Sequence, residues 1–531
     1  MTPADPSAPT APEANPAVNA SQESGERTPV RRALLSVWHK DGIGELGRAL
    51  AEAGAEVLST GGTLKALEAA GVPVREVSDY TGFPEMMSGR LKTLHPKVHG
   101  GILGRRGDEG DRAAMREHGI EAIDLVVVDL YPFEEAVASG ASHAETVEKI
   151  DIGGPTMLRS AAKNHADVAV VCDPDDYGWM AEAVRAGGTT AEERRRLAAK
   201  VFARTAAYDL AIARWFAEAM GEGALRYGEN PHQAATLVRA VPRRGLGRAE
   251  VLPGGKALSY NNWLDLDGAV SCVRELPQPA AVVVKHTNPC GAATDADAAS
   301  ALARAWDGDP LSAFGSVIAL NARFDAACAR YLAEPGHFVE VLAAPCFDDE
   351  AVEVLRNGPK WGRNARLVRV PELADRGGRA QWEARTLHGA WLLQESDDSD
   401  GWTESFQAVG AVAIPPGRED DLRLAQTLVK HLKSNAIALV KDGMLVGAGA
   451  GQMSRVDSCR IAAEKAGERA RGAVAGSDAF FPFPDGPETL AEAGVVAIVQ
   501  PGGSVKDAEV TAACDARGVA MVHTGVRHFR H

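Results

Sequence analysis

The sequence predicts an α/β protein with two domains. Short apolar, β-branched runs alternate with amphipathic stretches of helical length from Arg32 onward, a pattern typical of a parallel sheet covered by helices. A second series of strands begins near Ala281. The chain has 531 residues, more than one hydrophobic core usually holds, so we expect at least two domains.

The first domain follows a tail that is predicted to be disordered. Residues 1–28 are rich in Pro, Ala, Ser, Thr and Glu and carry almost no large apolar side chains, so they bury too little surface to offset the entropy of ordering. Beyond the tail, strands are predicted at 33–37, 55–58, 74–77, 125–130 and 168–171. Helices are predicted at 43–53 and 64–70, and a long helix over 190–218 closes the domain. We place its bounds at 29–222.

The second domain is predicted to occupy residues 223–531. Its strands are expected at 281–284, 316–320, 436–440, 445–446 and 495–499, with helical windows between them. The acidic stretch 396–405 is predicted to be an exposed loop, and no internal repeat is visible by inspection.

Composition narrows the class of protein. The net charge of −15 argues against a general nucleic-acid binder, and no apolar run reaches the length of a membrane span. The seven cysteines are widely spaced and form no Cys-x-x-Cys pair. A disulfide framework or a structural zinc site is therefore not expected, each cysteine is predicted to be a small buried side chain, and the expected location is the cytoplasm.

Polar segments interrupt the first domain at its predicted loops. The segment Ser59-Thr60-Gly61-Gly62-Thr63 lies between a strand and a helix, and it reads equally well as a phosphate cradle or as an ordinary turn with a helix cap. Residues 89–101 hold three cations and two histidines without an acid. Tyr131 follows a buried strand, and segments 150–154 and 161–165 add a further acid and base.

The second domain carries a basic pair at a strand end. The apolar run that starts at Ala281 stops at Lys285 and His286, where the chain enters a turn. Both side chains are expected to reach the crevice beyond the carboxyl ends of an open α/β sheet. The ammonium of Lys285 disfavours imidazolium at His286 and so favours the neutral form that a general base needs. By itself the pair is equally consistent with two solvated side chains.

Several long motifs, in order, resemble one known enzyme family. Lys-Thr-Leu-His-Pro at 92–96, Asp-Leu-Tyr-Pro-Phe at 129–133, Ile-Asp-Ile-Gly-Gly at 150–154 and Ala-Ala-Lys-Asn-His at 161–165 are similar to the cyclohydrolase half of the bifunctional phosphoribosylaminoimidazolecarboxamide (AICAR) formyltransferase/IMP cyclohydrolases. The formyltransferase half resembles this chain at 225–233, 285–291, 312–315, 433–435, 449–455, 477–483 and 527–531. The resemblance spans Arg32 to His531, and so many motifs in register are hard to obtain by chance.

The resemblance implies a fold and a function. It implies a methylglyoxal-synthase-like, Rossmann-like first domain and a larger formyltransferase domain of cytidine-deaminase-like units. It implies an enzyme of de novo purine biosynthesis that moves a formyl group from 10-formyltetrahydrofolate, its co-substrate, to AICAR and then closes formyl-AICAR to IMP with loss of water. It also implies small-molecule substrates, no required metal, and a homodimer with the formyltransferase site at the interface.

The resemblance also implies roles for individual residues. Formyl transfer is assigned to Lys285, His286 and Asn435, and cyclisation to Lys92, Tyr131, Asp151 and Lys163. The substrate contacts implied in the first domain are Ser36, Lys40, Ser59, Thr60, Gly61, Gly62, Thr63 and Arg90. Those implied in the second domain are Arg226, Tyr227, Gly315, Glu340, Arg455, Phe480, Arg527 and His531. One position departs from the family, because His39 stands where an aspartate is usual.

Four other interpretations compete with this one. A zinc deaminase needs His-x-Glu and Pro-Cys-x-x-Cys, but Asn288 and Ala293 occupy the glutamate and second cysteine positions, so we exclude it. The glycine spacing at 446–451 is wrong for dinucleotide binding. A nucleotide sensor would not need the proton-transfer set of the first domain. An enzyme limited to formyl transfer, with a degenerate first domain, is favoured only by His39.

Overall fold

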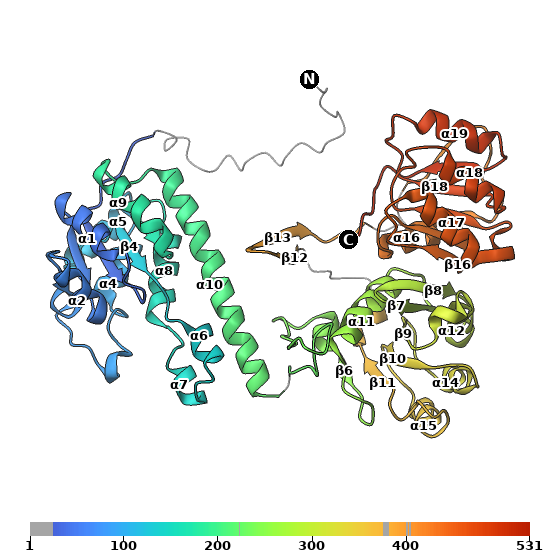
Figure 1. Ribbon diagram of the computed structural model, residues 1–531, viewed down its shortest axis with the longest axis horizontal. Helices are drawn as coiled ribbons and strands as arrows, with labels where there is room; N and C mark the ends of the chain where they lie inside the picture. The colour runs from blue at the N-terminus through green and yellow to red at the C-terminus, as the bar shows by residue number, and fades with distance from the viewer. Residues whose placement is uncertain (1–24, 222, 375–381, 400–401, 403–404) are drawn as a thin grey trace. The chain divides into compact units, whose positions relative to one another are not determined.

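The computed structural model describes residues 25–221, 223–374, 382–399, 402 and 405–531. It separates into two compact units, Met1–Glu222 (unit 1) and Gly223–His531 (unit 2), which Figure 1 shows in blue to green and in green to red. No helix in the described ranges combines the length and apolar character needed to cross a membrane.

Among its described residues, unit 1 is built on a five-stranded parallel sheet in the order β3-β2-β1-β4-β5. The register pairs Leu34 of β1 with Leu58 of β2 and with Val126 of β4. The strands are β1 (Arg32–Ser36), β2 (Glu56–Ser59), β3 (Arg75–Glu76), β4 (Leu125–Val128) and β5 (Ala169–Val171). The predicted parallel sheet is confirmed, and because the strands are parallel, their carboxyl ends and the loops that follow them share one edge.

Helices cover this sheet. Their bounds are α1 (Ile43–Glu52), α2 (Gly61–Ala69), α3 (Val77–Thr81), α4 (Pro96–Leu103), α5 (Glu109–Glu117), α6 (Phe133–Ala138), α7 (His143–Val147), α8 (Gly153–Lys163), α9 (Tyr177–Arg185) and α10 (Ala191–Ala219). The prediction of a strand at 74–77 was too long, since β3 ends at Glu76 and α3 begins at Val77. The long helix starts where a capping box forms: Thr190 accepts from the Glu193 N–H, and the Glu193 carboxylate accepts from the Thr190 N–H.

The end of the predicted disordered tail belongs to the fold. Thr28 forms an antiparallel bridge with Thr189, and Arg27 donates to Gly188 O at 2.6 Å and pairs with Glu193 at 3.3 Å. The assignment of all residues up to 28 to a tail was therefore wrong at its last residues, because backbone pairing and an ion pair outweigh their poor apolar content. Residues 1–24 lie outside the described part.

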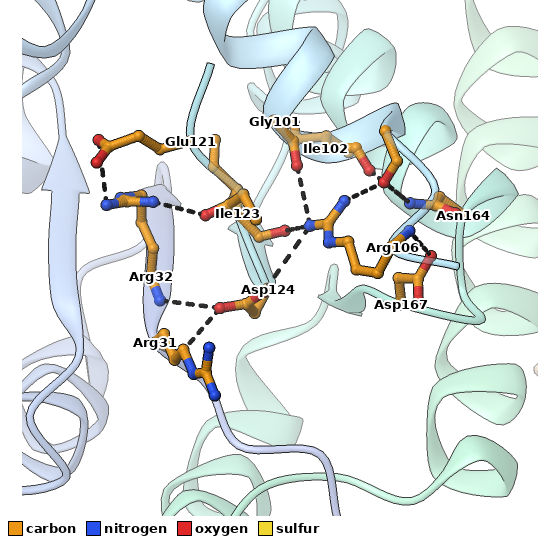
Figure 2. Close-up of polar contacts among 12 residues, drawn as sticks. Arg31, Arg32, Gly101, Ile102, Arg106, Glu121, Ile123, Asp124, Asn164 and Asp167 are labelled. Carbon is orange, nitrogen blue, oxygen red and sulfur yellow. Dashed lines mark hydrogen bonds and ion pairs between the residues drawn. The ribbon is translucent and has the colours of Figure 1, made fainter. Parts of the chain in front are cut away.

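A polar network closes the sheet at the amino ends of its strands (Figure 2). The carboxylate of Asp124, just before β4, accepts from the backbone N–H groups of Arg31 and Arg32 at 2.9 and 3.1 Å. Arg106 donates to Ile123 O at 2.8 Å, and Asn164 donates to Ile102 O at 2.8 Å. Asn164 therefore serves the end of the sheet opposite the loops that carry the predicted site.

Unit 2 holds a mixed sheet that, within the described residues, has twelve strands in the order β14-β19-β18-β17-β15-β16-β8-β7-β9-β10-β11-β6. One half comprises β6 (Glu250–Val251), β7 (Ala280–Lys285), β8 (Asn288–Thr294), β9 (Ser316–Leu320), β10 (Val339–Ala344) and β11 (Arg366–Arg369). The other comprises β14 (Gln407–Val409), β15 (Ile437–Lys441), β16 (Met444–Gly449), β17 (Val474–Ser477), β18 (Ala497–Gln500) and β19 (Ala520–His523).

The two halves repeat one topology. Each has a hairpin (β7–β8 or β15–β16), three further strands that are parallel to one another, and a short antiparallel edge strand. A helix precedes each hairpin, α11 (Tyr260–Val273) or α16 (Glu419–His431), and a helix follows it, α12 (Ala298–Asp307) or α17 (Arg455–Ala466). The halves join where Ala293 of β8 pairs with Met444 of β16. This repeat was not visible in the sequence.

The remaining helices of unit 2 lie beside the parallel strands. They are α13 (Pro310–Ala313), α14 (Ala326–Ala333), α15 (Asp349–Asn357), α18 (Asp485–Glu492) and α19 (Asp507–Asp515). The five predicted strands of this unit are present. The predicted loop at 396–405 lies partly outside the described residues. Among the described residues, none of the seven cysteines forms a disulfide, and five of them are buried.

One expectation about the basic pair was wrong. Lys285 and His286 do not stand at the carboxyl edge of a parallel sheet, because β7 is antiparallel to both of its neighbours, β8 and β9. They lie instead at the tip of the β7–β8 hairpin, whose two turn residues, His286 and Thr287, both have positive φ. The turn residues were recognised in the sequence, but the strand that follows contains Pro289 and Gly291, which hid it.

Candidate active sites

The unit 1 site forms around the amino terminus of α2. A Cβ built on Gly61 would lie 3.8 Å from Lys92 Nζ, and one built on Gly62 would lie 4.0 Å from Lys40 Nζ. Two ammonium groups therefore face the first turn of a helix, where free backbone N–H groups and the helix dipole also favour negative charge. Burial lowers the pKa of Lys40, an effect that the nearby Asp129 carboxylate partly opposes. This arrangement suits a phosphate.

His39 organises the loop that carries Lys40. The carboxylate of buried Asp129 accepts from the His39 backbone N–H at 2.9 Å and lies 2.6 Å from His39 Nδ1. Lys40 Nζ donates to Trp38 O at 2.9 Å. The β1 loop is therefore fastened to the β4 loop through His39, which removes the structural reason to regard the first domain as degenerate.

Two hydroxyls predicted to contact substrate are used inside the protein. Ser59 Oγ donates to Leu35 O at 2.8 Å, and Thr63 Oγ1 donates to Val37 O and accepts from Val37 N, both at 3.0 Å. Both side chains are buried, so they hold β2 and α2 against β1. Ser36 ends β1 and Thr60 occupies the N-cap position of α2, close to the same edge. Exposed Arg90 pairs with Glu148.

Asp151 stands at the entrance to α8, beside the β4 loop. Its carboxylate accepts from the Gly154 N–H at 2.8 Å and from the backbone of Tyr131. Burial raises the pKa of Asp151 above its usual range, although these hydrogen bonds oppose the shift. A Cβ built on Gly153 would meet Thr93 Oγ1 at 2.9 Å, so the Lys92 loop also lies here. The structure thus gathers Lys92, Tyr131 and Asp151 around one edge.

Lys163 does not join this group within the chain. It is the last residue of α8, whereas Asp151 precedes the first residue of that helix. The 11 residues of α8 span about 16 Å, so the two side chains stand at opposite ends of the helix. The next residue, Asn164, belongs to the network at the opposite end of the sheet (Figure 2).

Tyr208 of α10 is a residue that the sequence analysis missed. It is buried, its hydroxyl donates to Lys149 O at 3.0 Å, and it accepts from the Asp151 N–H at 2.8 Å. Burial raises the pKa of Tyr208 to about 12, so the hydroxyl stays protonated. No sequence motif indicated it, since its partner lies 57 residues away.

The unit 2 site forms around the tip of the β7–β8 hairpin. Lys285 Nζ donates to Phe314 O at 2.8 Å and to Gly315 O at 3.2 Å. His286 is exposed, and its imidazole has no hydrogen-bond partner among the described residues. The hairpin therefore directs the ammonium into the structure and leaves the imidazole open to a ligand.

Two cavities flank the first turn of α11. The larger, about 470 Å³, is lined by Glu229, Asn230, Asn261, Leu264, Asp265, His286 and Thr287. The other, about 290 Å³, includes Arg226, Tyr227, Phe338, Glu340 and Arg366 in its wall. Arg226 donates to the Tyr227 hydroxyl at 2.8 Å, and Glu340 pairs with buried Arg366. A Cβ on Gly315 would lie 3.3 Å from the Phe338 ring, so Gly315 adjoins the smaller cavity.

Asn288 links the hairpin tip to the other half of the sheet. Its side chain donates to His286 O at 2.9 Å and accepts from the Lys433 N–H at 2.9 Å. This brings the segment 433–435 beside the tip. Burial lowers the pKa of Lys433, and the charge of Arg530 adds to the effect.

Asn435 and Arg455 are engaged with the protein itself. The Asn435 amide donates to Gln452 O at 2.8 Å and accepts from Arg455 at 2.7 Å. Arg455 is buried and pairs with Asp478. The charge of Arg455 is thus neutralised inside the fold, and this geometry favours a structural use of both side chains over direct substrate contact.

The remaining predicted contacts lie near the end of β17 and in the C-terminal segment. Phe480 is exposed, Arg527 covers the Phe529 ring at 4.5 Å, and Lys433 Nζ donates to His531 O at 2.7 Å. The His528 N–H donates to Asp478 O at 3.0 Å, which ties the C-terminal segment to the loop of Phe480. No group of three or more His, Cys, Asp or Glu side chains in the described ranges could hold a metal ion.

Comparisons with known proteins match this chain to one family along most of its length. The model of the AICARFT/IMPCHase bienzyme family matches residues 161–465, and that of the MGS-like domain matches residues 42–156. Curated relatives named bifunctional purine biosynthesis protein PurH include that of Rhodopirellula baltica, 46% identical over 95% of this chain and 99% of the relative. Those of Parvibaculum lavamentivorans and Sorangium cellulosum are 49% and 50% identical, covering 96% and 94% of this chain and 98% and 100% of the relatives.

Proposed function

This chain belongs to the AICARFT/IMPCHase bienzyme family, and from that premise we propose how its two units divide two reactions of purine biosynthesis. The chain transfers a formyl group from 10-formyltetrahydrofolate to AICAR, then closes formyl-AICAR to IMP with loss of water. We assign formyl transfer to unit 2 and cyclisation to unit 1. The observation that carries this division is that each unit holds its own cluster of proton-transfer groups beside a separate binding edge.

Formyl transfer needs a base, because the 5-amino group of AICAR is conjugated with an imidazole and a carboxamide and is a poor nucleophile. We assign His286 as the base that removes a proton as the amine attacks the formyl carbon, since its imidazole is exposed and open to a ligand. We assign Lys285, whose ammonium donates to two carbonyls, to stabilise the developing oxyanion. The formyl C–N bond to folate then breaks, and the folate nitrogen takes up a proton.

Substrate contacts in unit 2 follow from the cavities. Arg226 and Tyr227 form one wall of the smaller cavity and offer a cation and a hydroxyl for an anionic, aromatic ligand. Gly315, Glu340, Phe480, Arg527 and His531 are proposed as further contacts. Asn435 and Arg455 are proposed to shape the pocket through the loop at 451–453 and through Asp478.

Cyclisation joins two groups of one molecule, so positioning does much of the work. We place the phosphate of formyl-AICAR at Lys40, Gly61 and Gly62. The carboxamide nitrogen attacks the formyl carbon and gives up one proton as the formyl oxygen becomes a hydroxyl. That hydroxyl leaves as water while the nitrogen that carried the formyl group loses its proton and forms the new C=N bond, so the two N–H protons depart in the water. Asp151, whose pKa is raised by burial, is suited to protonate the departing hydroxyl, while Lys92 and Tyr131 stabilise the oxyanion that precedes it.

One incubation tests the function, and two variants test the division. The protein is mixed with AICAR and 10-formyltetrahydrofolate, and formyl-AICAR and IMP are quantified over time. Wild type should form IMP, His286→Ala should form neither product yet still cyclise supplied formyl-AICAR, and Lys92→Ala should accumulate formyl-AICAR. A nucleotide sensor would form no product. If His286→Ala transfers formyl at near the wild-type rate, the unit 2 assignment is wrong.

We also propose that the chain works as a homodimer with the formyltransferase site at the interface. The support is the hairpin of β12 (Trp382–Leu387) and β13 (Ala390–Glu395), whose strands pair with each other and extend away from the large sheet (Figure 1). Trp382 and Leu393 are 60% and 61% exposed. An isolated two-stranded hairpin with apolar side chains is marginally stable in water, so a covering surface is expected.

Light scattering tests the homodimer. Wild type should have twice the mass of one chain, and the double variant Trp382→Ser/Leu393→Ser should shift toward the monomer and lose formyl transfer before cyclisation. A wild-type monomer with full activity would contradict the proposal. We further propose a cytoplasmic location, which the seven cysteines outside any disulfide support.

A further inference from the structure

The turn that carries His286 has an unfavourable backbone. His286 and Thr287 have φ of 50° and 63°, so both central residues of the β7–β8 turn are left-handed. Turns of this kind normally use Asn-Gly or Gly-Gly, because side chains with a Cβ, and β-branched ones above all, are strained there. Such strain persists only where the surroundings compensate for it. The compensating group must therefore lie next to the turn.

That group is Asp265 on α11. Its Oδ1 accepts from the Thr287 N–H at 2.6 Å. The helix also approaches the turn closely one helical turn further along, where a Cβ built on Gly268 would lie 3.2 Å from Thr287 O. Burial raises the pKa of Asp265, although the hydrogen bond from the Thr287 N–H favours its ionised form.

The other half of the sheet repeats the device. At the tip of the β15–β16 hairpin, Asp442 and Gly443 have φ of 52° and 74°. The carboxylate of Asp421, on the corresponding helix α16, accepts from their N–H groups at 2.9 and 2.7 Å. The same contact thus occurs at both tips, and it does not depend on a catalytic histidine.

The two tips differ in their turn residues. Asp442-Gly443 suits a left-handed turn, whereas His286-Thr287 does not. The first tip therefore replaces favourable turn residues with a reactive one, and it depends more strongly on its helix carboxylate. Without that anchor, the turn would relax toward backbone conformations that carry the imidazole of His286 away from the cavity that it lines.

We propose that Asp265 is a positioning residue for formyl transfer, which holds the left-handed His286–Thr287 turn so that the imidazole faces its substrate. The proposal rests on the assignment of formyl transfer to unit 2. It predicts that Asp265 acts through the turn rather than through its charge or through contact with substrate.

Three substitutions at position 265 separate these roles. Asp265→Ala removes the acceptor and should lower kcat for formyl transfer about 10- to 100-fold, with KM for AICAR and for folate changed by less than about 3-fold. Asp265→Asn keeps an acceptor oxygen and should stay within about 5-fold of wild-type kcat. Asp265→Glu keeps the charge but displaces the carboxylate, so its kcat should fall below that of the Asn variant.

A second-site change tests the turn itself. Thr287→Gly removes the Cβ that strains the left-handed conformation, so in the Asp265→Ala background it should recover at least about 5-fold in kcat. Asp297→Ala is the matched control, because Asp297 is an exposed carboxylate in the same unit that also accepts a backbone N–H, from Ser300 at 2.9 Å. It should lose stability but retain formyl transfer.

The outcomes distinguish the proposal from the function on which it rests. If wild type transfers no formyl group, the proposed function fails. If wild type is active and Asp265→Ala keeps kcat within about 3-fold, the positioning role is wrong. A raised KM at unchanged kcat would make Asp265 a substrate contact, and an Asn variant as impaired as the Ala variant would make it a charge effect; either result overturns the proposal. Cyclisation of supplied formyl-AICAR, measured on each preparation, should not change.

Discussion

Tyr208→Phe should impair cyclisation by releasing the segment that carries Asp151. The substitution keeps the buried ring, whose centroid lies 6.2 Å from that of the Phe133 ring, and removes only the hydroxyl. Two hydrogen bonds disappear, one to Lys149 O at 3.0 Å and one from the Asp151 N–H at 2.8 Å. Leaving buried backbone groups without a partner costs about 1–3 kcal/mol.

That cost sets the expected size of the effects. For a unit of this length, each kcal/mol corresponds to about 2–4 °C in the unfolding temperature, so unit 1 should unfold roughly 2–12 °C lower. Displacing a catalytic group by about 1 Å commonly costs about 100-fold in rate, and we therefore expect cyclisation to fall about 10- to 100-fold. Formyl transfer in unit 2 should be unaffected.

Tyr177→Phe is the matched control. Tyr177 is also a buried tyrosine of unit 1, but its hydroxyl has no hydrogen-bond partner among the described residues. Removing it should cost no stability and no activity. The assay follows conversion of supplied formyl-AICAR to IMP alongside thermal unfolding of each variant. Cyclisation within about 3-fold of wild type in Tyr208→Phe would refute the positioning of Asp151 by this hydroxyl.

Three further predictions follow from named contacts. Asp151→Asn should abolish cyclisation yet raise the thermal stability of unit 1 near neutral pH. Burial raises the pKa of Asp151 in the folded state above the ordinary 3.8, so the native state binds the proton more tightly than the unfolded state does. The stability of the wild type therefore falls as the pH rises from 3.8 through the folded pKa, whereas the Asn variant has no such loss. Thermal unfolding of both proteins across pH checks this. If the unfolding temperatures of wild type and variant differ as much below pH 3.8 as near neutral pH, the reasoning is contradicted. Gly315→Ala should lower formyl transfer several-fold, because the new Cβ would lie 3.3 Å from the Phe338 ring and 3.4 Å from Lys285 Nζ at a φ of 74°; unchanged steady-state rates would show that Lys285 and Phe338 move freely. His39→Ala should raise KM for formyl-AICAR more than it lowers kcat, since it removes the imidazole contact with Asp129 and leaves the loop of Lys40 held there by the backbone N–H alone. An unchanged KM would separate that loop from the phosphate.

The strands and their burial followed from the sequence because local patterns encode them. Apolar β-branched runs produced β1, β2, β4, β5, β7, β9 and β15 close to their predicted bounds. Of the strands that escaped prediction, β8 contains the turn residues Asn288-Pro289, and β6 and β11 are only two to four residues long. The strands β10, β12 and β13 also escaped prediction, although each has six residues and no turn residue. The partner of β6 is β11, far along the chain, so no local pattern marks that pairing.

The residues of the candidate sites likewise fall into those that local motifs indicate and those whose placement depends on packing. Motifs identified Lys92, Tyr131 and Asp151 and the pair Lys285–His286, because reactive residue types cluster locally in loops. The helix length that separates Lys163 from Asp151, and the inward use of Ser59, Thr63, Asn435 and Arg455, depend on how elements pack and could not be read from residue type.

The sequence by itself determined the fold class of unit 1 and the family, and it indicated the candidate reactive residues, since periodicity and short motifs are local properties of the chain. Tertiary structure alone decided which residues position them. Tyr208 reaches Asp151 from a helix 57 residues away, and Asp265 supports the strained turn 22 residues beyond it. The repeated topology of unit 2 likewise became visible only in the pairing of its strands, because hydrogen bonds between backbones impose a pattern that side-chain identity does not record.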